Sequence, residues 1–324
     1  MQKTIFNIQS EQDFKEAALR VFKHQFDNND VYRSFCDLLY KNPSDVKEIQ
    51  EIPFLPIQFF KSHDILSSKE NVIKTFTSSG TTGSIPSKHN VTDLSWYHES
   101  YLKGFQFFYG DVKDYNILAL LPSYLEREGS SLIYMVDDLI QQTNKPASGF
   151  YMQNLSELSS TLKELDAKGE KTLLIGVTFA LLDLIEKETF QLNNTLIMET
   201  GGMKGRRKEL VREQLHKILS KGFGVNKIHS EYGMTELLSQ GYSNGEGVFK
   251  CPPWMRVLTR DTEDALTILD TYQTGGINII DLANYNSCSF IATQDLGKVK
   301  EDGTFQVLGR FDHSDIRGCN LLVV

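Results

Sequence analysis

A run of hydroxyl-bearing and glycine residues, Thr77-Ser-Ser-Gly-Thr-Thr-Gly-Ser84, has the composition of a phosphate-binding loop. Glycine lets the backbone come close to a ligand and adopt positive φ, so that successive N–H groups and hydroxyls can surround phosphate oxygens. Lys88 follows shortly afterwards and could add positive charge. The run is not a Walker A loop, because no Gly-Lys-Ser/Thr stands at the required spacing, and it is not a dinucleotide fingerprint. Taken alone, it fits a phosphate site or an ordinary polar loop equally well.

Three later segments place aromatic, acidic and basic residues beside glycines: Ser230-Glu-Tyr-Gly-Met-Thr-Glu236, Thr293-Gln-Asp-Leu-Gly297 and Gly309-Arg-Phe-Asp312. A lone Tyr-Gly-x-Thr-Glu is more simply a turn that leads into a helix, with the threonine and the glutamate near its cap. Each segment alone is weak evidence for a nucleotide site. All of them in one order along the chain are strong evidence, because the chance that independent coincidences occur together is the product of their separate chances.

Together and in this order, these segments resemble the motifs of the adenylate-forming superfamily, which includes acyl-CoA synthetases, peptide-synthetase adenylation domains and luciferases. The resemblance implies that Tyr232 packs on adenine, that Thr235 reaches the α-phosphate of ATP and that Glu236 holds Mg²⁺. It also implies that Asp295 binds both ribose hydroxyls and that Arg310 contacts ribose or phosphate. The full nucleotide-binding set expected on this basis is Ser78, Ser79, Gly80, Thr81, Thr82, Gly83, Lys88, Gly201, Gly202, Tyr232, Gly233, Thr235, Asp295 and Arg310.

Further segments are similar to one branch of that superfamily, the acyl-protein synthetase subunit of the bacterial bioluminescence fatty-acid reductase complex. The likeness implies two steps. A carboxylic acid, in this branch a fatty acid, attacks the α-phosphorus of Mg·ATP and gives acyl-adenylate and pyrophosphate. A cysteine thiolate then takes the acyl group and releases AMP, and a partner reductase or transferase accepts the acyl group afterwards. The segments are Ile52–Lys61, Leu121–Ser131, Thr200–Gly205 and Ile316–Cys319.

Cys319 is the acyl acceptor that the resemblance implies, because this branch uses a cysteine close to the C-terminus. A thiolate is intrinsically very nucleophilic, and Gly318 gives the segment mobility. A reduced cysteine packed in a last strand is the open alternative. The cysteines show no metal-ligand spacing and are too few for a disulfide scaffold: Cys36, Cys251, Cys288 and Cys319.

Two features depart from the superfamily. Gln294 stands where the family usually has glycine. Most members also carry a C-terminal domain with a catalytic lysine, whereas this sequence ends at Val324, soon after the hinge-like segment. Another cation would then have to take the role of that lysine. Lys204 is the first candidate, and Arg206 and Lys88 are others.

Two other functions stay open. An acid–CoA ligase for an aryl or acyl acid would use the same motifs and leave Cys319 dispensable. A non-catalytic subunit that binds ATP or acyl-AMP would fit the missing lysine domain. The net charge of −8 argues against a nucleic-acid partner. The longest apolar stretch, 173–185, is too short to span a bilayer, and no signal-peptide core is present, which predicts a cytoplasmic protein without membrane insertion.

The elements that must position these residues follow from the spacing of apolar side chains. Phe14, Ala18, Val21 and Phe22 recur at helical spacing and predict an N-terminal helix. From residue 72 to about 232, short apolar runs alternate with helical patterns, which predicts an α/β fold with layered, mainly parallel sheets flanked by helices. The expected strands are Val72–Phe76, Asn116–Leu121, Thr172–Val177 and Thr195–Met198, and the expected helices are 94–108, 132–140, 180–186 and 208–219.

The sequence pattern changes after about residue 240. From there on, short strand-like runs are separated by Gly, Asn and Asp. We therefore expect an α/β adenylate-forming core with an N-terminal helical segment over 1–240. A small β-rich subdomain with the acyl-acceptor segment is expected over 241–324, without the usual C-terminal lysine domain. The strand-like runs are Leu266–Asp270, Ile277–Asp281, Ser289–Thr293 and Thr304–Leu308.

Overall fold

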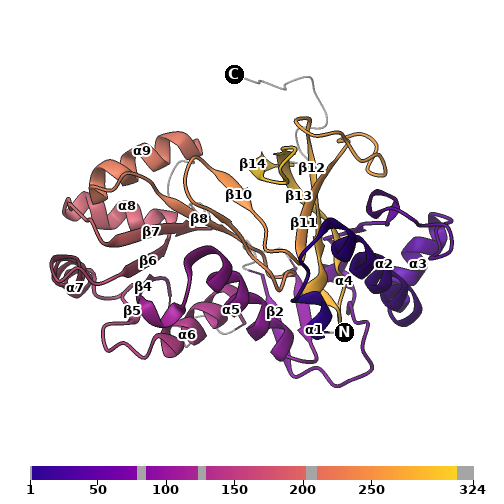
Figure 1. Ribbon diagram of the computed structural model, residues 1–324, viewed down its shortest axis with the longest axis horizontal. Coiled ribbons are helices and arrows are strands. Elements are labelled where there is room, and N and C mark those ends of the chain that lie inside the picture. Colours follow the sequence, from indigo (N-terminus) through magenta and orange to yellow (C-terminus); the bar gives the residue numbers. More distant parts are fainter. Residues whose placement is uncertain (1, 79–84, 123–128, 202–209, 312–324) are drawn as a thin grey trace.

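The computed structural model describes residues 2–78, 85–122, 129–201 and 210–311. Its centre is a mixed sheet of 12 strands in the order β11-β12-β13-β14-β10-β9-β8-β7-β6-β4-β5, with β1 added beside β13. Helices lie against both halves of this sheet (Figure 1). The expected α/β class with flanking helices is confirmed.

The first half of the sheet is parallel. It consists of β4 (Asn116–Leu120), β6 (Thr172–Val177), β7 (Thr195–Thr200) and β8 (His229–Tyr232), with the short β5 (Gly149–Phe150) at its edge. Every residue of β4 and β6 is buried, as expected for strands that are covered on both faces.

Helices cover the two faces of this parallel half. α5 (Ser95–Tyr109) and α6 (Ser131–Thr143) lie on one face, and α8 (Thr178–Lys187) and α9 (Arg212–Phe223) lie on the other (Figure 1). α7 (Leu155–Ala167) packs against β6. The helices expected from the sequence at 94–108, 132–140 and 180–186 are confirmed, and α9 begins at Arg212, later than expected.

Beyond β8 the sheet becomes antiparallel without a break. The further strands are β9 (Gly241–Ser243), β10 (Val248–Lys250), β11 (Met255–Arg260), β12 (Thr274–Asp281), β13 (Phe290–Val299) and β14 (Phe305–Arg310). One sheet therefore runs through residue 240, and the division of the chain at that point stays a prediction. β2 (Lys74–Thr77) and β3 (Lys88–Val91) form a separate antiparallel pair.

The prediction of a strand at Leu266–Asp270 is wrong. Only Ile268 makes an isolated bridge, to Arg260. The side chains of Asp261 and Asp264 accept hydrogen bonds from nearby backbone N–H groups, which holds this segment in local turns instead.

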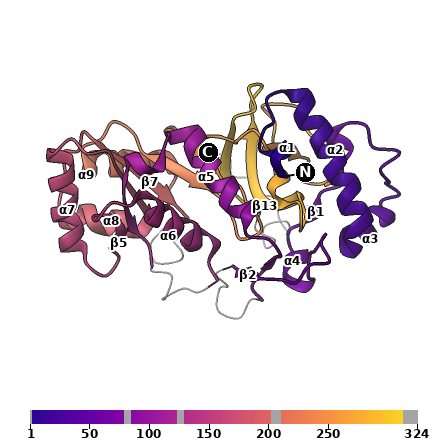
Figure 2. The same ribbon diagram turned by 60° about the horizontal axis from the view of Figure 1, so that its bottom comes forward.

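The N-terminal helices are α1 (Gln2–Ile5), α2 (Glu11–Asn28) and α3 (Asp30–Leu38), followed by β1 (Leu55–Pro56) and α4 (Phe59–Ser62). Ser10 and Asp13 form a capping box that begins α2. α2 and α3 pack beside the antiparallel strands, at the end of the molecule opposite α7 and α9 (Figures 1 and 2). β1 pairs in parallel with β13, so this first segment and the last strands form one unit. No helix among the described residues is long and apolar enough to cross a membrane.

Candidate functional site

One large cleft collects most of the described residues that the motifs single out. It lies where the end of β8 and the turn after it meet β13, β14, the β2–β3 pair and the start of α9. Lys88 is exposed and is not among the residues that line the cleft, whereas its neighbour Ser87 and the cation Lys61 are. The predicted residues that line it are Ser78, Gly201, Tyr232, Gly233, Thr235, Glu236, Asp295 and Arg310.

The remaining predicted residues have no described geometry. Ser79, Gly80, Thr81, Thr82, Gly83, Gly202, Lys204, Arg206 and Cys319 all lie outside the described residues. Their roles stay predictions.

Asp295, Tyr232 and Arg310 meet at one corner of the cleft. The Tyr232 hydroxyl donates to Asp295 Oδ2 at 2.7 Å, and Arg310 Nε donates to Asp295 Oδ1 at 3.1 Å. The β13–β14 ladder pairs Asp295 directly with Arg310 across the strands. Because the Arg310 side chain is 80% exposed, this ion pair contributes little to stability and is free to open for a ligand. The corner is therefore a carboxylate that a hydroxyl and a guanidinium hold in place.

An aromatic wall continues from this corner. The Tyr232 ring packs 5.9 Å from Phe249 and 5.5 Å from Phe305, and the Arg212 guanidinium lies 4.8 Å above the Phe249 ring. Burial raises the pKa of Tyr232 well above its usual value, so its hydroxyl keeps its proton and remains a donor. Aromatic side chains beside a carboxylate, with Tyr232 and Phe249 in the cleft lining, suit a nucleobase and its ribose.

Gln294 lies at an irregularity in β13. Gly276 of β12 pairs with Leu296 and Asn278 pairs with Ala292, so residues 293–295 of β13 face the single residue Ile277. The Phe311 N–H donates to the Gln294 carbonyl at 2.7 Å, which ties this irregular segment to the end of β14.

Glu236 is a nearly buried carboxylate on the cleft wall, with 5% of its surface exposed. Burial raises its pKa, and a hydrogen bond from Ser87 together with the charges of Arg310 and Lys61 opposes that rise. Asn284 donates to the Glu236 carbonyl at 2.7 Å, which fixes the backbone and leaves the carboxylate to face the cleft.

His89 holds the neighbouring residue. Its Nδ1 lies 2.8 Å from the Thr235 carbonyl, and since a carbonyl only accepts, Nδ1 carries the proton. Burial lowers the pKa of His89 to about 4, so the ring is neutral at pH 7. It positions the Thr235–Glu236 turn.

The base of the Ser/Thr/Gly loop is held by hydrogen bonds beside the Thr235–Glu236 turn. The Ser78 N–H donates to the Ser87 carbonyl at 3.1 Å, and the Ser87 N–H donates to Ser78 Oγ at 2.9 Å. The Thr77 N–H donates to the Gly129 carbonyl at 2.7 Å. Thr77 and Ser78 are therefore fixed in the lining of the cleft.

Two acidic residues that sequence reasoning missed lie between the predicted ones. Ser230 Oγ donates to Glu199 at 2.7 Å, and His216 lies 3.5 Å from the same carboxylate. Although burial opposes it, His216 and Arg212 hold the pKa of Glu199 below its usual value. Burial and the charge of Glu199 raise the pKa of Glu231 to about 7. The sequence held a signal only for Glu199, an acidic residue that directly follows the expected strand Thr195–Met198. Glu231 lies in a strand that the sequence analysis did not predict.

Magnesium fits the cleft through one carboxylate. No group of three or more His, Cys, Asp or Glu side chains among the described residues could hold a metal ion alone. Mg²⁺ in nucleotide enzymes is usually bound by one or two carboxylates together with substrate phosphates, and Glu236 supplies such an oxygen.

Comparison with known proteins confirms the resemblance seen in the sequence. The family model "Acyl-protein synthetase, LuxE" matches residues 5–99. A long-chain-fatty-acid–luciferin-component ligase of Vibrio harveyi is 24% identical over 96% of this chain and 88% of its own length. The ligase of the same name from Photorhabdus luminescens is 39% identical over 70 residues, which are 21% of this chain and 60% of the relative.

Solved structures show the same fold. An open form of 2-hydroxyisobutyryl-CoA ligase, in complex with 2-HIB-AMP and CoA, has a TM-score of 0.67 at 12% identity, covering 94% of this chain and 70% of that one. ATP-bound MatB from Rhodopseudomonas palustris has a TM-score of 0.54 at 17% identity, and the match covers 75% of this chain. The matched part is 49% of the MatB chain, about half its length.

Proposed function

We propose that the protein activates a carboxylic acid with Mg·ATP as an acyl-adenylate and then transfers the acyl group to a cysteine thiol. The observation that carries this proposal is the convergence of Tyr232, Glu236, Asp295 and Arg310, from three separate segments, on one cleft. The Vibrio harveyi relative, similar over nearly the whole chain, bears the name of a ligase that joins a long-chain fatty acid to a luciferin component.

The first step brings two anions together, since the acid's carboxylate oxygen forms a bond to the α-phosphorus and pyrophosphate leaves with the bonding electrons. Catalysis of such a transfer depends on positioning and on positive charge around the phosphates. Tyr232 and Phe249 hold the base, and Asp295 holds the ribose. Ser78 and Thr235, which both line the cleft, face the phosphates. Mg²⁺ bound at Glu236 would neutralise phosphate charge.

The second step breaks the new acyl–phosphate bond. The thiolate of Cys319 forms a bond to the acyl carbon, and AMP leaves with its phosphate oxygen. A partner reductase or transferase then takes the acyl group. The described cysteines, Cys36, Cys251 and Cys288, are free, which fits work in the reducing cytoplasm.

Lys204 is the catalytic cation in this proposal, and the cleft offers a second one. Lys61 lines the cleft close enough to influence Glu236 electrostatically. It also ends the segment Ile52–Lys61, which resembles acyl-protein synthetases.

Two measurements test the proposal. Purified protein should catalyse ATP–pyrophosphate exchange only when a carboxylic acid is present. Its intact mass should rise by the acid minus one water after incubation with acid and Mg·ATP, without CoA. ATP binding with no acid-dependent exchange would indicate a binding subunit. Formation of acyl-CoA without any mass increase of the protein would indicate a CoA ligase.

Asp295→Asn is expected to weaken ATP binding by about 10- to 100-fold, the cost of losing one charge-assisted hydrogen-bond acceptor. Asparagine keeps one oxygen for the Tyr232 hydroxyl and cannot accept from two ribose hydroxyls as the carboxylate does. Calorimetric titration with ATP measures the effect, with the exposed Glu301→Gln on the β13–β14 turn as the matched control. Equal affinity in Asp295→Asn and wild type would remove Asp295 from the ribose site.

A further inference from the structure

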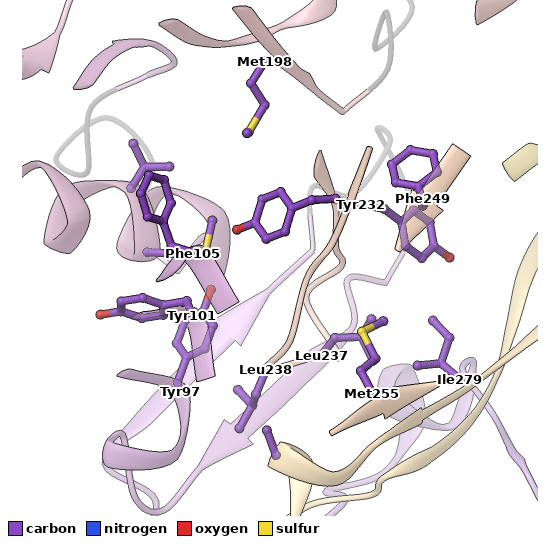
Figure 3. Close-up of a cluster of buried hydrophobic side chains, with 14 of the residues drawn as sticks. Tyr97, Tyr101, Phe105, Met198, Tyr232, Leu237, Leu238, Phe249, Met255 and Ile279 are labelled. Carbon is purple, nitrogen blue, oxygen red and sulfur yellow. The ribbon is translucent and has the colours of Figure 1, made fainter. Parts of the chain in front are cut away.

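Strand β8 presents two neighbouring side chains to opposite sides. Successive side chains of a strand point to opposite faces of the sheet, so Tyr232 and Glu231 lie on different faces. Tyr232 faces Phe249, Phe305 and Asp295. Glu231 lies on the face covered by α5, with its charge felt by Tyr97, Tyr109 and Tyr242. Figure 3 shows Tyr97, Tyr101 and Phe105 of α5 on one side of this region and Tyr232 with Phe249 on the other.

The cleft reaches the Glu231 side as well. We call its lining there the α5–α6 wall, because it joins those helices to the ends of β7 and β8. On the proposed function, the nucleotide occupies the Tyr232 side, and the attacking acid approaches the α-phosphorus opposite the departing pyrophosphate. The α5–α6 wall is then the part of the cleft left for the acid. It consists of Tyr97, Ser131, Leu132, Met135, Thr200 and Glu231.

Glu231 is held there with spare hydrogen-bonding capacity. Thr200 Oγ1 donates to its Oε2 at 2.5 Å, and this is the side-chain donor that the described residues offer it. A hydroxyl of α5 that feels the charge of Glu231, that of Tyr97, donates instead to the Ser131 carbonyl at 2.9 Å. A carboxylate has about four acceptor positions, and Glu231 lines the cleft, so among the described residues it keeps acceptor capacity for a ligand there.

We propose that Glu231, oriented by Thr200, binds a hydrogen-bond donor on the acid substrate, so that the enzyme prefers acids with a hydroxyl or amino group near the carboxylate over unsubstituted chains. An unsubstituted chain would cover the Glu231 carboxyl and offer it no hydrogen bond beyond the one from Thr200, which is costly in a buried site. Sites built to bind a substrate hydroxyl reject the analogue that lacks it far more strongly than apolar pockets reject one methylene. The assignment rests on the proposed function and narrows its substrate class.

The protonation of Glu231 is compatible with this role. Because burial and the charge of Glu199 raise its pKa to about 7, much of the residue is neutral near pH 7. A neutral carboxyl does not repel the carboxylate of the incoming acid, and in either protonation state it can accept from a hydroxyl or an amine.

The test compares acids that differ only in the donor. ATP–pyrophosphate exchange is measured with butyrate, 3-hydroxybutyrate and 3-aminobutyrate, and with myristate and 3-hydroxymyristate. We expect kcat/KM for a hydroxy or amino acid to exceed that of its parent chain by about 10-fold or more in the wild type. Glu231→Leu should bring the ratio close to one, and Glu231→Gln, which can still accept, should keep most of it. Glu213→Leu, an exposed acid at the cleft rim, is the matched control and should leave the ratio unchanged.

The outcomes separate this inference from the proposed function. Exchange that is equal or faster with the parent acids in the wild type overturns the role of Glu231 and leaves acid activation intact. No exchange with any acid overturns the proposed function, and calorimetric binding of the same acids then decides the preference alone. If Glu231→Leu does not fold, the wild-type panel and Glu231→Gln still decide.

Discussion

Glu236→Gln is expected to lower acid-dependent ATP–pyrophosphate exchange by about 10²- to 10³-fold, the usual effect of removing one preorganised electrostatic group from such a site. Glutamine has nearly the same shape as glutamate and carries no charge to hold Mg²⁺. The fold should survive, because the hydrogen bond from Asn284 goes to the backbone carbonyl of residue 236 and does not need the carboxylate.

The measurement is the exchange rate at increasing Mg²⁺ concentration. A metal ligand shifts the Mg²⁺ dependence to higher concentration, whereas a merely structural residue lowers the rate at every concentration alike. Glu213→Gln at the cleft rim serves as the control, since its side chain is 77% exposed and pairs with Lys217. If Glu236→Gln exchanges at the wild-type rate across the whole Mg²⁺ series, Glu236 does not bind the metal.

Cys319→Ser is expected to abolish the acyl mass increment and leave ATP–pyrophosphate exchange nearly unchanged, because the first step does not use the thiol. The described cysteines are poor acceptors. Burial raises the pKa of Cys36 and of Cys251 to about 12 and raises that of Cys288 further, so none of them forms a thiolate at neutral pH.

The matched control is Cys251→Ser, which changes the described cysteine that is only partly buried. It should keep the full mass increment. Peptide mapping of the acylated wild type should place the label on Cys319. A mass increment of wild-type size in Cys319→Ser would rule this cysteine out as the acceptor and return attention to CoA or a partner protein.

The parallel half of the fold was predictable because its strands are buried on both faces. Continuous apolar runs mark β4 and β6 in the sequence, and Pro and Gly punctuate their ends. The strands from β8 to β10 were harder to predict, because they have only three or four residues each and mix polar with apolar side chains. Helix α7 was missed although Leu158, Leu162 and Leu165 recur at helical spacing.

The residues of the site also differ in how well the sequence predicted them. Motif spacing brought Tyr232, Asp295 and Arg310 to one corner, as the resemblance implied. Lys61 and Glu231 were not singled out from the sequence, although both lie inside segments that carry the resemblance. Their importance depends on which wall of the cleft their side chains line. That information arises from contacts between distant segments and has no local signature.

The packing of α2 against the last strands has a consequence for the order of folding during synthesis. Gln25 hydrogen-bonds to the carbonyl of Asn284, which lies 259 residues later in the chain, and Tyr32 and Phe22 pack against Phe290. At ribosomal rates of about 5–20 residues per second, α2 waits roughly 13–50 s for these partners. During that time α2 can pack on α3 but lacks Phe290, so part of its apolar face stays uncovered and offers chaperones a binding site until β13 has been made.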